Sequence, residues 1–369
     1  MHLKRFGRLI ALLFAVAITL LFALPAIAGG PSDAPSPATE NSVCLACHSN
    51  LNLTYKLPSG EVLSLFVDQK MFDASVHGQK NQKCTDCHTN ISNYPHPPIA
   101  ATTARDFSLQ MYTLCKSCHE TEYKDTLDSM HTKVLASGNR NAPVCTDCHT
   151  AHNVTPANTP RTRIPQTCQK CHSAIYDQYK SSVHGAALLD NSNPDVPTCV
   201  DCHGVHNVSD PLTVAYRLKS PQICANCHTN SAMMKKYNLS TNVLNSYVAD
   251  FHGTTVEMFE KQSPDAPTNK PVCFDCHGTH DIRSAKDPNS TVFKANLLKT
   301  CQQCHPNATA NFPSSWLSHY DASPTRYPII YYVNLFYTII IPLVIGGMLA
   351  FVLLDAARRI KNRVQKGSH

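Results

Sequence analysis

Between residues 41 and 325 the sequence lacks the long apolar-periodic stretches from which most globular domains build a core. The whole chain contains one Trp, and charged residues make up only 16% of it. A segment of this composition buries little apolar surface through its own side chains. A conventional large hydrophobic core is therefore excluded, and much of the buried surface has to be supplied by something other than aliphatic residues.

No cysteine is left over when the 18 Cys are grouped, because they form nine Cys-x-x-Cys pairs, each followed directly by His. Zinc sites use paired Cys-x-x-Cys units without requiring a His after each one, and a disulfide framework does not explain the histidines. The pattern is the attachment signature of c-type haem, in which two thiols bond to the porphyrin and the adjacent His is the proximal iron ligand. Numbered one to nine, the motifs contain Cys44, Cys47 and His48; Cys84, Cys87 and His88; Cys115, Cys118 and His119; Cys145, Cys148 and His149; Cys168, Cys171 and His172; Cys199, Cys202 and His203; Cys224, Cys227 and His228; Cys273, Cys276 and His277; and Cys301, Cys304 and His305.

Nine further histidines remain once these ligands, His2 and the final His369 are set aside. They are His77, His96, His131, His152, His184, His206, His252, His280 and His319. Nine motifs and nine spare histidines predict nine covalently bound haem c groups with two axial histidines each. The alternative for any one of them is a surface or capping histidine. That alternative is strongest for His96, which lies between Pro95 and Pro97, eight residues after His88. Substitution by Met130, Met233, Met234 or Met258 is also open, although Met more often fills gaps.

The spare histidines alternate between two sequence contexts. After the odd-numbered motifs they occur in "SVHG", "SMHT", "SVHG", "DFHG" and "LSHY"; after the even-numbered ones they follow the motif itself, as in "CHTAH" and "CHGVH". His203 and His206 lie three apart and would share a face of a helical turn. Two ligands of one iron approach from opposite faces, so we expect His206 to reach a different haem. We expect the Gly after several distal histidines to let the backbone approach a porphyrin ring.

The two ends of the chain differ from the middle. A basic start followed by the apolar stretch 9–24 and an Ala-x-Ala site predict a signal peptide over 1–28, with an uncleaved anchor as the alternative. Residues 29–40 are rich in Pro, Ser and Ala and predict a linker. Residues 327–355 predict a transmembrane helix, and the basic tail 356–369 predicts a cytoplasmic C-terminus; a buried core helix is the alternative.

The region 41–325 is therefore expected to be a nonahaem domain. We predict a mainly α fold with much irregular structure, organised by stacked haems, with short helices at the motifs and little or no sheet. The formal charge is +6, but haem propionates would make the assembled domain acidic. The basic composition thus does not predict a nucleic-acid partner.

The paired motifs resemble those of multihaem c-type cytochromes, in particular the cytochrome c554/c7-like group, over most of residues 41–320. The resemblance implies electron transfer, with haem as the redox group. Quinol-oxidising multihaem cytochromes with an N-terminal anchor differ from this chain, whose expected anchor is C-terminal.

Two classes of function stay open. The first is a carrier anchored in the inner membrane, with its haem domain on the extracytoplasmic, periplasmic face, that passes electrons between a quinone-linked membrane complex and soluble or extracellular redox partners. The second is an oxidoreductase acting on a small nitrogen or sulfur compound at an open haem. No Cys-x-x-Cys-Lys variant occurs, and no catalytic residue is predicted. A structural metal-binding module is a third interpretation.

The apolar span has no His and no internal carboxylate, so we expect an integral partner subunit, such as a b-type cytochrome, to handle the quinone.

Overall fold

The structure is a computed structural model that describes residues 37–91, 94–315, 319–320 and 322–366. The predicted signal peptide, residues 1–28, lies outside the described residues, as does the segment 29–36 of the expected linker. Helix α2 (Pro37–His48) begins inside that linker, so residues 37–40 are helical. Helix α2 also carries the first attachment motif, which ends at His48.

The chain divides into two compact units, of which the first contains residues up to Lys56 and the segment Val62–Pro98. Besides α2, its elements are β1 (Thr54–Lys56), β2 (Val62–Ser64), α3 (Gln69–Ala74), the 3₁₀ helix η1 (Gly78–Lys80) and α4 (Cys84–Cys87). Strands β1 and β2 form an antiparallel hairpin with Tyr55 opposite Leu63. This two-stranded hairpin is the sheet of the described residues, which confirms the expectation of little strand.

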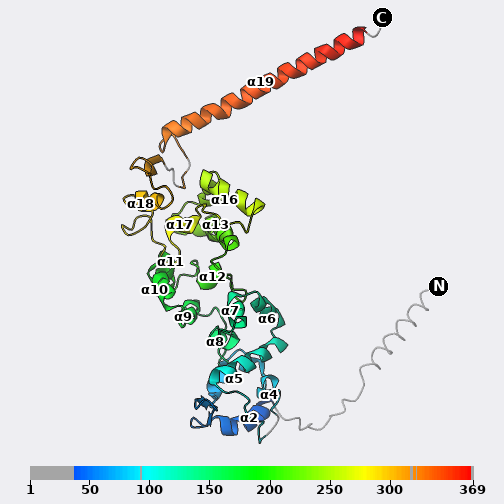
Figure 1. The fold of residues 1–369 in the computed structure, drawn as a ribbon, viewed down its shortest axis with the longest axis vertical. Helices are drawn as coiled ribbons and strands as arrows, with labels where there is room; N and C mark the ends of the chain where they lie inside the picture. The colour runs from blue at the N-terminus through cyan, green and yellow to red at the C-terminus, as the bar shows by residue number, and fades with distance from the viewer. Residues whose placement is uncertain (1–36, 92–93, 316–318, 321, 367–369) are drawn as a thin grey trace, which may run out of the picture. The chain divides into compact units, whose positions relative to one another are not determined.

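The second unit contains Leu57–Glu61 and Ile99–His369. Figure 1 shows a series of short helices joined by irregular segments, followed by one long helix. The elements are α5 (Ala104–Met111), η2 (Tyr112–Ser117), α6 (Glu120–Leu127), α7 (Met130–Ala136), α8 (Cys145–His149), α9 (Arg163–Gln169), α10 (Ser173–Ser181), α11 (Val183–Asn191), α12 (Cys199–His203), α13 (Val214–His228), α14 (Ser231–Lys236), α15 (Val243–Val248), α16 (Phe251–Gln262), α17 (Cys273–His277), α18 (Leu297–Gln302), η3 (Pro313–Ser315) and α19 (Pro328–Lys366). The predicted mainly helical, irregular fold is confirmed.

Three of the spare histidines that follow odd motifs, His131, His184 and His252, lie in the first turn of a helix. Ser129, Ser182 and Asp250 are the N-caps of α7, α11 and α16, and their side chains accept backbone N–H groups of the first turn. Such capping satisfies donors that have no partner inside the helix. The recurring Ser-x-His and Asp-x-His sequences are therefore helix starts that present the histidine from the first turn.

Side-chain packing in the described residues gives only a thin core. One buried cluster consists of Leu218, Tyr247, Val256 and Val272, from α13, α15, α16 and the residue before α17. Its members come from the helices around motifs seven and eight. Packing thus concentrates where two attachment motifs meet, as expected for a domain organised by its haem sites.

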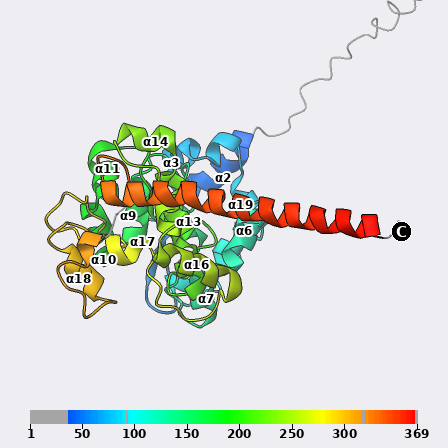
Figure 2. The same ribbon diagram turned by 90° about the horizontal axis from the view of Figure 1, so that it is seen from above.

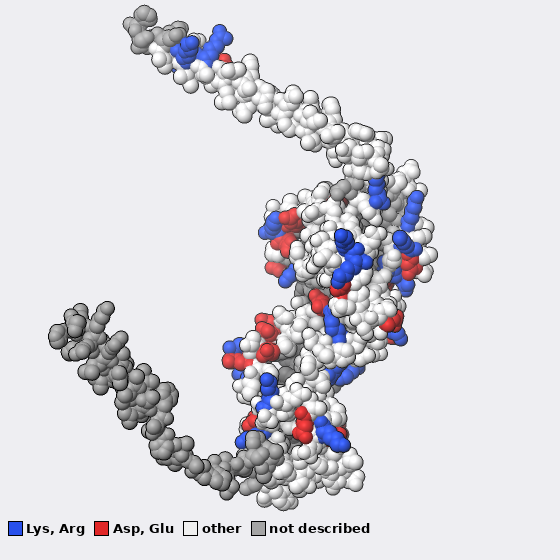
Figure 3. All heavy atoms as spheres, turned by 180° about the vertical axis from the view of Figure 1, so that it is seen from behind, with Lys and Arg blue, Asp and Glu red and all other residues white. Residues whose placement is uncertain are grey.

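Helix α19 is long and apolar enough to cross a membrane, over Pro328–Val364, with a mean hydropathy of 2.4 and none of its apolar window buried by the rest of the chain. Figure 2 shows it as one continuous helix, and Figure 3 shows an uncharged surface along most of it with basic residues near its C-terminal end. The helix extends past residue 355, the predicted end of the span, because Arg and Lys of the tail are good helix formers.

Candidate haem-binding sites

Seven of the predicted proximal histidines face a predicted distal histidine. The distances between ring centroids are 6.0 Å for His48–His96 and His203–His280; 6.2 Å for His149–His206, His184–His228, His252–His305 and His277–His319; and 6.3 Å for His131–His172. Every one of these pairs joins one motif histidine to one spare histidine.

The separation suits an iron between the rings. Two imidazole–metal bonds of about 2 Å each, added to the distance from each ring centre to its ligating nitrogen, give a centroid separation of about 6 Å. Direct stacking of two histidines would bring the rings closer than this. In the described part of the chain, no group of three or more His, Cys, Asp and Glu side chains gathers to hold a bare metal ion. The separation of the rings in each pair fits a haem iron between them.

The pairing follows an alternating rule. Spare histidines after odd motifs face the next odd motif, as His131, His184 and His252 face motifs five, seven and nine. Those after even motifs face the preceding even motif, as His206 and His280 face motifs four and six. At the ends of the series the step is one motif: His96 faces motif one and His319 faces motif eight.

The conformation of "CHGVH" is set by the residue at which α12 ends. His203 is the last residue of that helix, and Gly204 has a positive φ of 86°. The expectation that His203 and His206 share one helical turn is therefore wrong. Nevertheless they face different partners, His280 and His149 respectively. Gly278 repeats the turn after α17, and Thr150 does so after α8 with a φ of 63°.

Four predicted ligands lie outside these seven pairs. His77, His88, His119 and His152 keep their ligand roles as predictions from the sequence. Burial, followed by the nearby rings of His48 and His96, lowers the pKa of His88. Its imidazole is thus favoured in the neutral form that binds a metal.

The attachment cysteines lie against one another in consecutive motifs. The first cysteine of motifs one, three, five and seven lies close enough to the first cysteine of the next motif for one thiol to shift the pKa of the other. The pairs are Cys44–Cys84, Cys115–Cys145, Cys168–Cys199 and Cys224–Cys273. Motifs one and two, three and four, five and six, and seven and eight are therefore neighbours in space.

The second cysteine of each of three even motifs interacts with the first cysteine of the odd motif that follows it. Cys148 interacts electrostatically with Cys168, Cys202 with Cys224, and Cys276 with Cys301. Within the second compact unit, motifs three to nine therefore follow one another in space in their sequence order. This order was not deducible from motif spacing, which is uneven.

Neighbouring groups orient several of the rings. The Nδ1 atom of His48 lies 2.7 Å from the carbonyl oxygen of Leu65, and Nδ1 of His319 lies 3.1 Å from the Ser246 hydroxyl. A partner at Nδ1 leaves Nε2 for a metal. Burial, and then the facing ring, lowers the pKa of His184 and of His277 to about 4. These imidazoles are neutral above that pH, as an iron ligand has to be.

The Gly that follows a distal histidine has a role in helix packing. A Cβ on Gly185 would lie 1.9 Å from the carbonyl oxygen of Tyr179, and one on Gly253 would lie 2.1 Å from that of Tyr247. Gly78 is placed in the same way against Phe72. These glycines admit the backbone of the preceding helix, so the close approach is between two helices.

A repeated Arg–Asp contact, which was not predicted from the sequence, joins an odd motif to the even motif that follows it. Even motifs carry Asp directly before their second cysteine, and Asp147, Asp201 and Asp275 each accept the N–H of the N-cap residue of the motif helix. The same carboxylates bind Arg105, Arg161 and Arg217, at 2.9, 3.0 and 2.6 Å.

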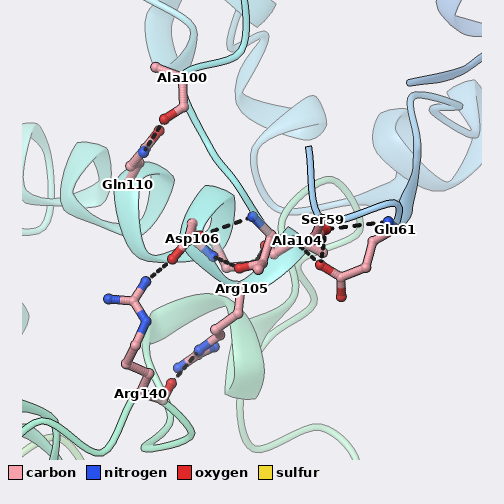
Figure 4. Close-up of polar contacts among 10 residues, drawn as sticks. Ser59, Glu61, Ala100, Ala104, Arg105, Asp106, Gln110 and Arg140 are labelled. Atoms are coloured by element: carbon pink, nitrogen blue, oxygen red, sulfur yellow. Dashed lines mark hydrogen bonds and ion pairs between the residues drawn. The ribbon is translucent and has the colours of Figure 1, made fainter. Parts of the chain in front are cut away.

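Each of these arginines precedes an odd motif and also donates to the backbone before the even motif, to Arg140 O, Pro194 O and Lys270 O. Figure 4 shows Arg105 directed toward the Arg140 backbone, with the Arg140 side chain on Asp106. The signal was present in the sequence: Asp occupies this motif position in "CTDCH", "CVDCH" and "CFDCH" and in no odd motif.

Comparisons with known proteins agree with this reading of the sites. Residues 139–229 match the family model for cytochrome c3, and residues 70–150 match that for cytochrome c7 and related cytochrome c. The multiheme cytochrome MtrA of Shewanella baltica (strain OS185) is 24% identical over 273 residues, which are 73% of this chain and 65% of that relative. The alignment thus spans just under two thirds of the relative. Together with the attachment motifs, these matches support the interpretation of the chain as a multihaem c-type cytochrome.

Proposed function

We propose that the chain is an electron carrier that holds nine haem c groups in series, each with two axial histidines. The single observation that carries the proposal is the set of seven histidine pairs at 6.0–6.3 Å. Bound haem supplies reversible one-electron chemistry, while the protein sets spacing and potential. The contacts between consecutive motifs support transfer from one haem to the next along motifs three to nine.

The protein's part in this function is to fill both axial positions. At the seven paired sites, a ring on each side would leave no open coordination position at which a small substrate could bind, which favours a carrier over an oxidoreductase. His96, the candidate that departs from the sequence pattern, faces His48 like the others. Two histidines also favour a lower potential than Met/His ligation does.

The proposal includes attachment to a membrane by α19, with the haem domain on the extracytoplasmic side of the inner membrane. The length and exposure of the apolar helix support an anchor, and the basic residues after it support a cytoplasmic tail. The span lacks His and has its nearest carboxylate at Asp355. Exchange with quinone would therefore require an integral partner subunit, such as a b-type cytochrome, and the motifs most distant in sequence from α19 would serve soluble or extracellular redox partners.

Spectroscopy of the purified holoprotein tests the central proposal. Intact mass and a pyridine haemochrome assay should give nine haems per chain, and EPR of the oxidised protein should show only low-spin ferric signals. A stoichiometric high-spin signal would refute bis-histidine ligation throughout and support the oxidoreductase. For the partner, the purified chain in detergent should accept electrons from a menaquinol analogue slowly until the membrane subunit is added.

A further inference from the structure

Asp250 stands out among the residues that cap the distal-histidine helices. Its Oδ1 atom accepts the backbone N–H of His252 at 2.9 Å and lies 3.1 Å from Nδ1 of the same histidine. The equivalent position two residues before His77, His131 and His184 is occupied by Ser. A carboxylate thus replaces a neutral hydroxyl in one repeat.

The partner of this histidine is known from the pairing. His252 faces His305 of motif nine at 6.2 Å, so it would be the distal ligand of the haem attached through Cys301 and Cys304. With Nδ1 directed at Asp250, Nε2 is the nitrogen left for iron. Hydrogen bonding from a ligating histidine to a carboxylate raises the basicity of the ligand, and such bonds are one of the means by which proteins set haem potentials.

We propose that Asp250 lowers the reduction potential of the ninth haem by accepting the Nδ1 hydrogen of its distal ligand His252. This inference rests on the proposed bis-histidine ligation. On reduction the iron gains one electron, no bond is broken, and the proton stays on Nδ1. A more basic imidazole favours the ferric state. The side chains of His252 and Asp250 are 31% and 33% exposed, so solvent screens the effect without removing it.

The ninth haem is attached at one end of the series of motifs, and this position determines what a lower reduction potential would do. Motif nine is the last before α19, so Asp250 acts on the end of the series that is adjacent in sequence to the candidate anchor. With Asp at residue 250, this terminal haem would have a stronger tendency to pass its electron on than it would with Ser at the same residue.

The test is a redox titration of the full-length holoprotein, followed by absorbance and EPR, for the wild type, Asp250→Ser and Asp250→Asn. Both variants retain a capping acceptor, and Ser is the residue found at the equivalent positions. We expect one of nine components to move upward, by about 59 mV for a tenfold change in its reduction equilibrium constant. The low-spin signal of one haem should change with it. Asp265→Asn removes an exposed carboxylate from the loop after α16 and should leave all nine potentials in place.

Unchanged potentials in both Asp250 variants, with nine low-spin haems retained, would overturn the inference and leave Asp250 as a helix cap alone. A failure of the proposed function looks different, because a high-spin signal or a low haem count would then appear in the wild type itself.

Discussion

At the scale of single residues, each distal histidine after an odd motif depends on the residues beside it. At His131, His184 and His252, a Ser or Asp two positions earlier is the N-cap of the helix, and Gly directly after His77, His184 and His252 allows the preceding helix to approach. Position 185 shows how little room remains, since Gly185 is buried and its backbone lies against that of Tyr179.

We predict that Gly185→Ala destabilises the holoprotein by roughly 1–3 kcal/mol, the range for overpacking a tight site. A Cβ at 1.9 Å from the Tyr179 carbonyl oxygen forces α10 and α11 apart and moves His184. Thermal unfolding should show a lower midpoint. Gly346→Ala, in α19 with no atom near its Cβ position, is the matched control and should leave the midpoint unchanged.

His206→Ala should remove the distal ligand of the fourth haem, which is attached through Cys145 and Cys148, and leave the sixth haem intact. His206 faces His149, whereas His203 of the adjacent motif faces His280. One high-spin signal should appear in EPR with all nine haems retained. Val205→Ala, at a 57% exposed neighbour, should give the wild-type spectrum. Conversion of the sixth haem instead would contradict the pairing.

At the scale of elements, the Arg–Asp contacts fasten an odd motif to the even motif that follows it. Arg217 on α13 donates to both carboxylate oxygens of Asp275 on α17, at 3.0 and 2.6 Å, and to Lys270 O at 2.9 Å. The side chains are only 25% and 27% exposed, so the contact is better protected from solvent than an ordinary surface pair.

Arg217→Met should therefore lower stability by about 1.5–3 kcal/mol, as expected for lost hydrogen bonds to a charged group. Arg217→Lys should rescue only part of it, since an ammonium cannot bind both oxygens in the same fork. Thermal unfolding checks both variants. Lys261→Ala breaks an exposed pair with Glu257 and should change little. Equal effects at positions 217 and 261 would show that the contact is merely a surface ion pair.

The attachment motifs and the candidate ligands could be predicted from the sequence because haem attachment is encoded locally, in five consecutive residues. The apolar span was likewise readable from hydropathy. The partner of each histidine was not, because His131 faces His172 through packing between segments that sequence spacing does not describe. Likewise, the helix end at His203 depends on a positive φ at Gly204, which the pattern "CHGVH" permits without requiring.

At the scale of the whole molecule, one long exposed helix follows a series of motifs, three to nine, that adjoin in sequence order. None of the apolar window of α19 is buried by the chain, so the domain does not depend on it for packing.

Removal of residues 327–369 should release the haem domain into the soluble fraction with its haem content and spectrum unchanged. Cell fractionation and a haem stain measure this. If the truncated protein stays with the membrane, the apolar N-terminal segment is acting as an uncleaved anchor.

The direction of the span can be tested separately. A reporter fused after His369 should be active on the cytoplasmic side, because positively charged residues follow the apolar stretch. Activity restricted to the outer side would reverse the proposed orientation.

The alternating histidine pairs also impose an order on maturation. On the proposed ligation, irons five, seven and nine would take their distal ligands from upstream, from His131, His184 and His252, which are already made when the motif emerges. Irons four and six would wait for His206 and His280, which are synthesised later. A polypeptide made from its N-terminus would thus complete centres five, seven and nine as their motifs appear, and centres four and six only after a later segment has been made. A nascent chain halted after motif six would already hold its fifth iron in final form, with its sixth still lacking a ligand.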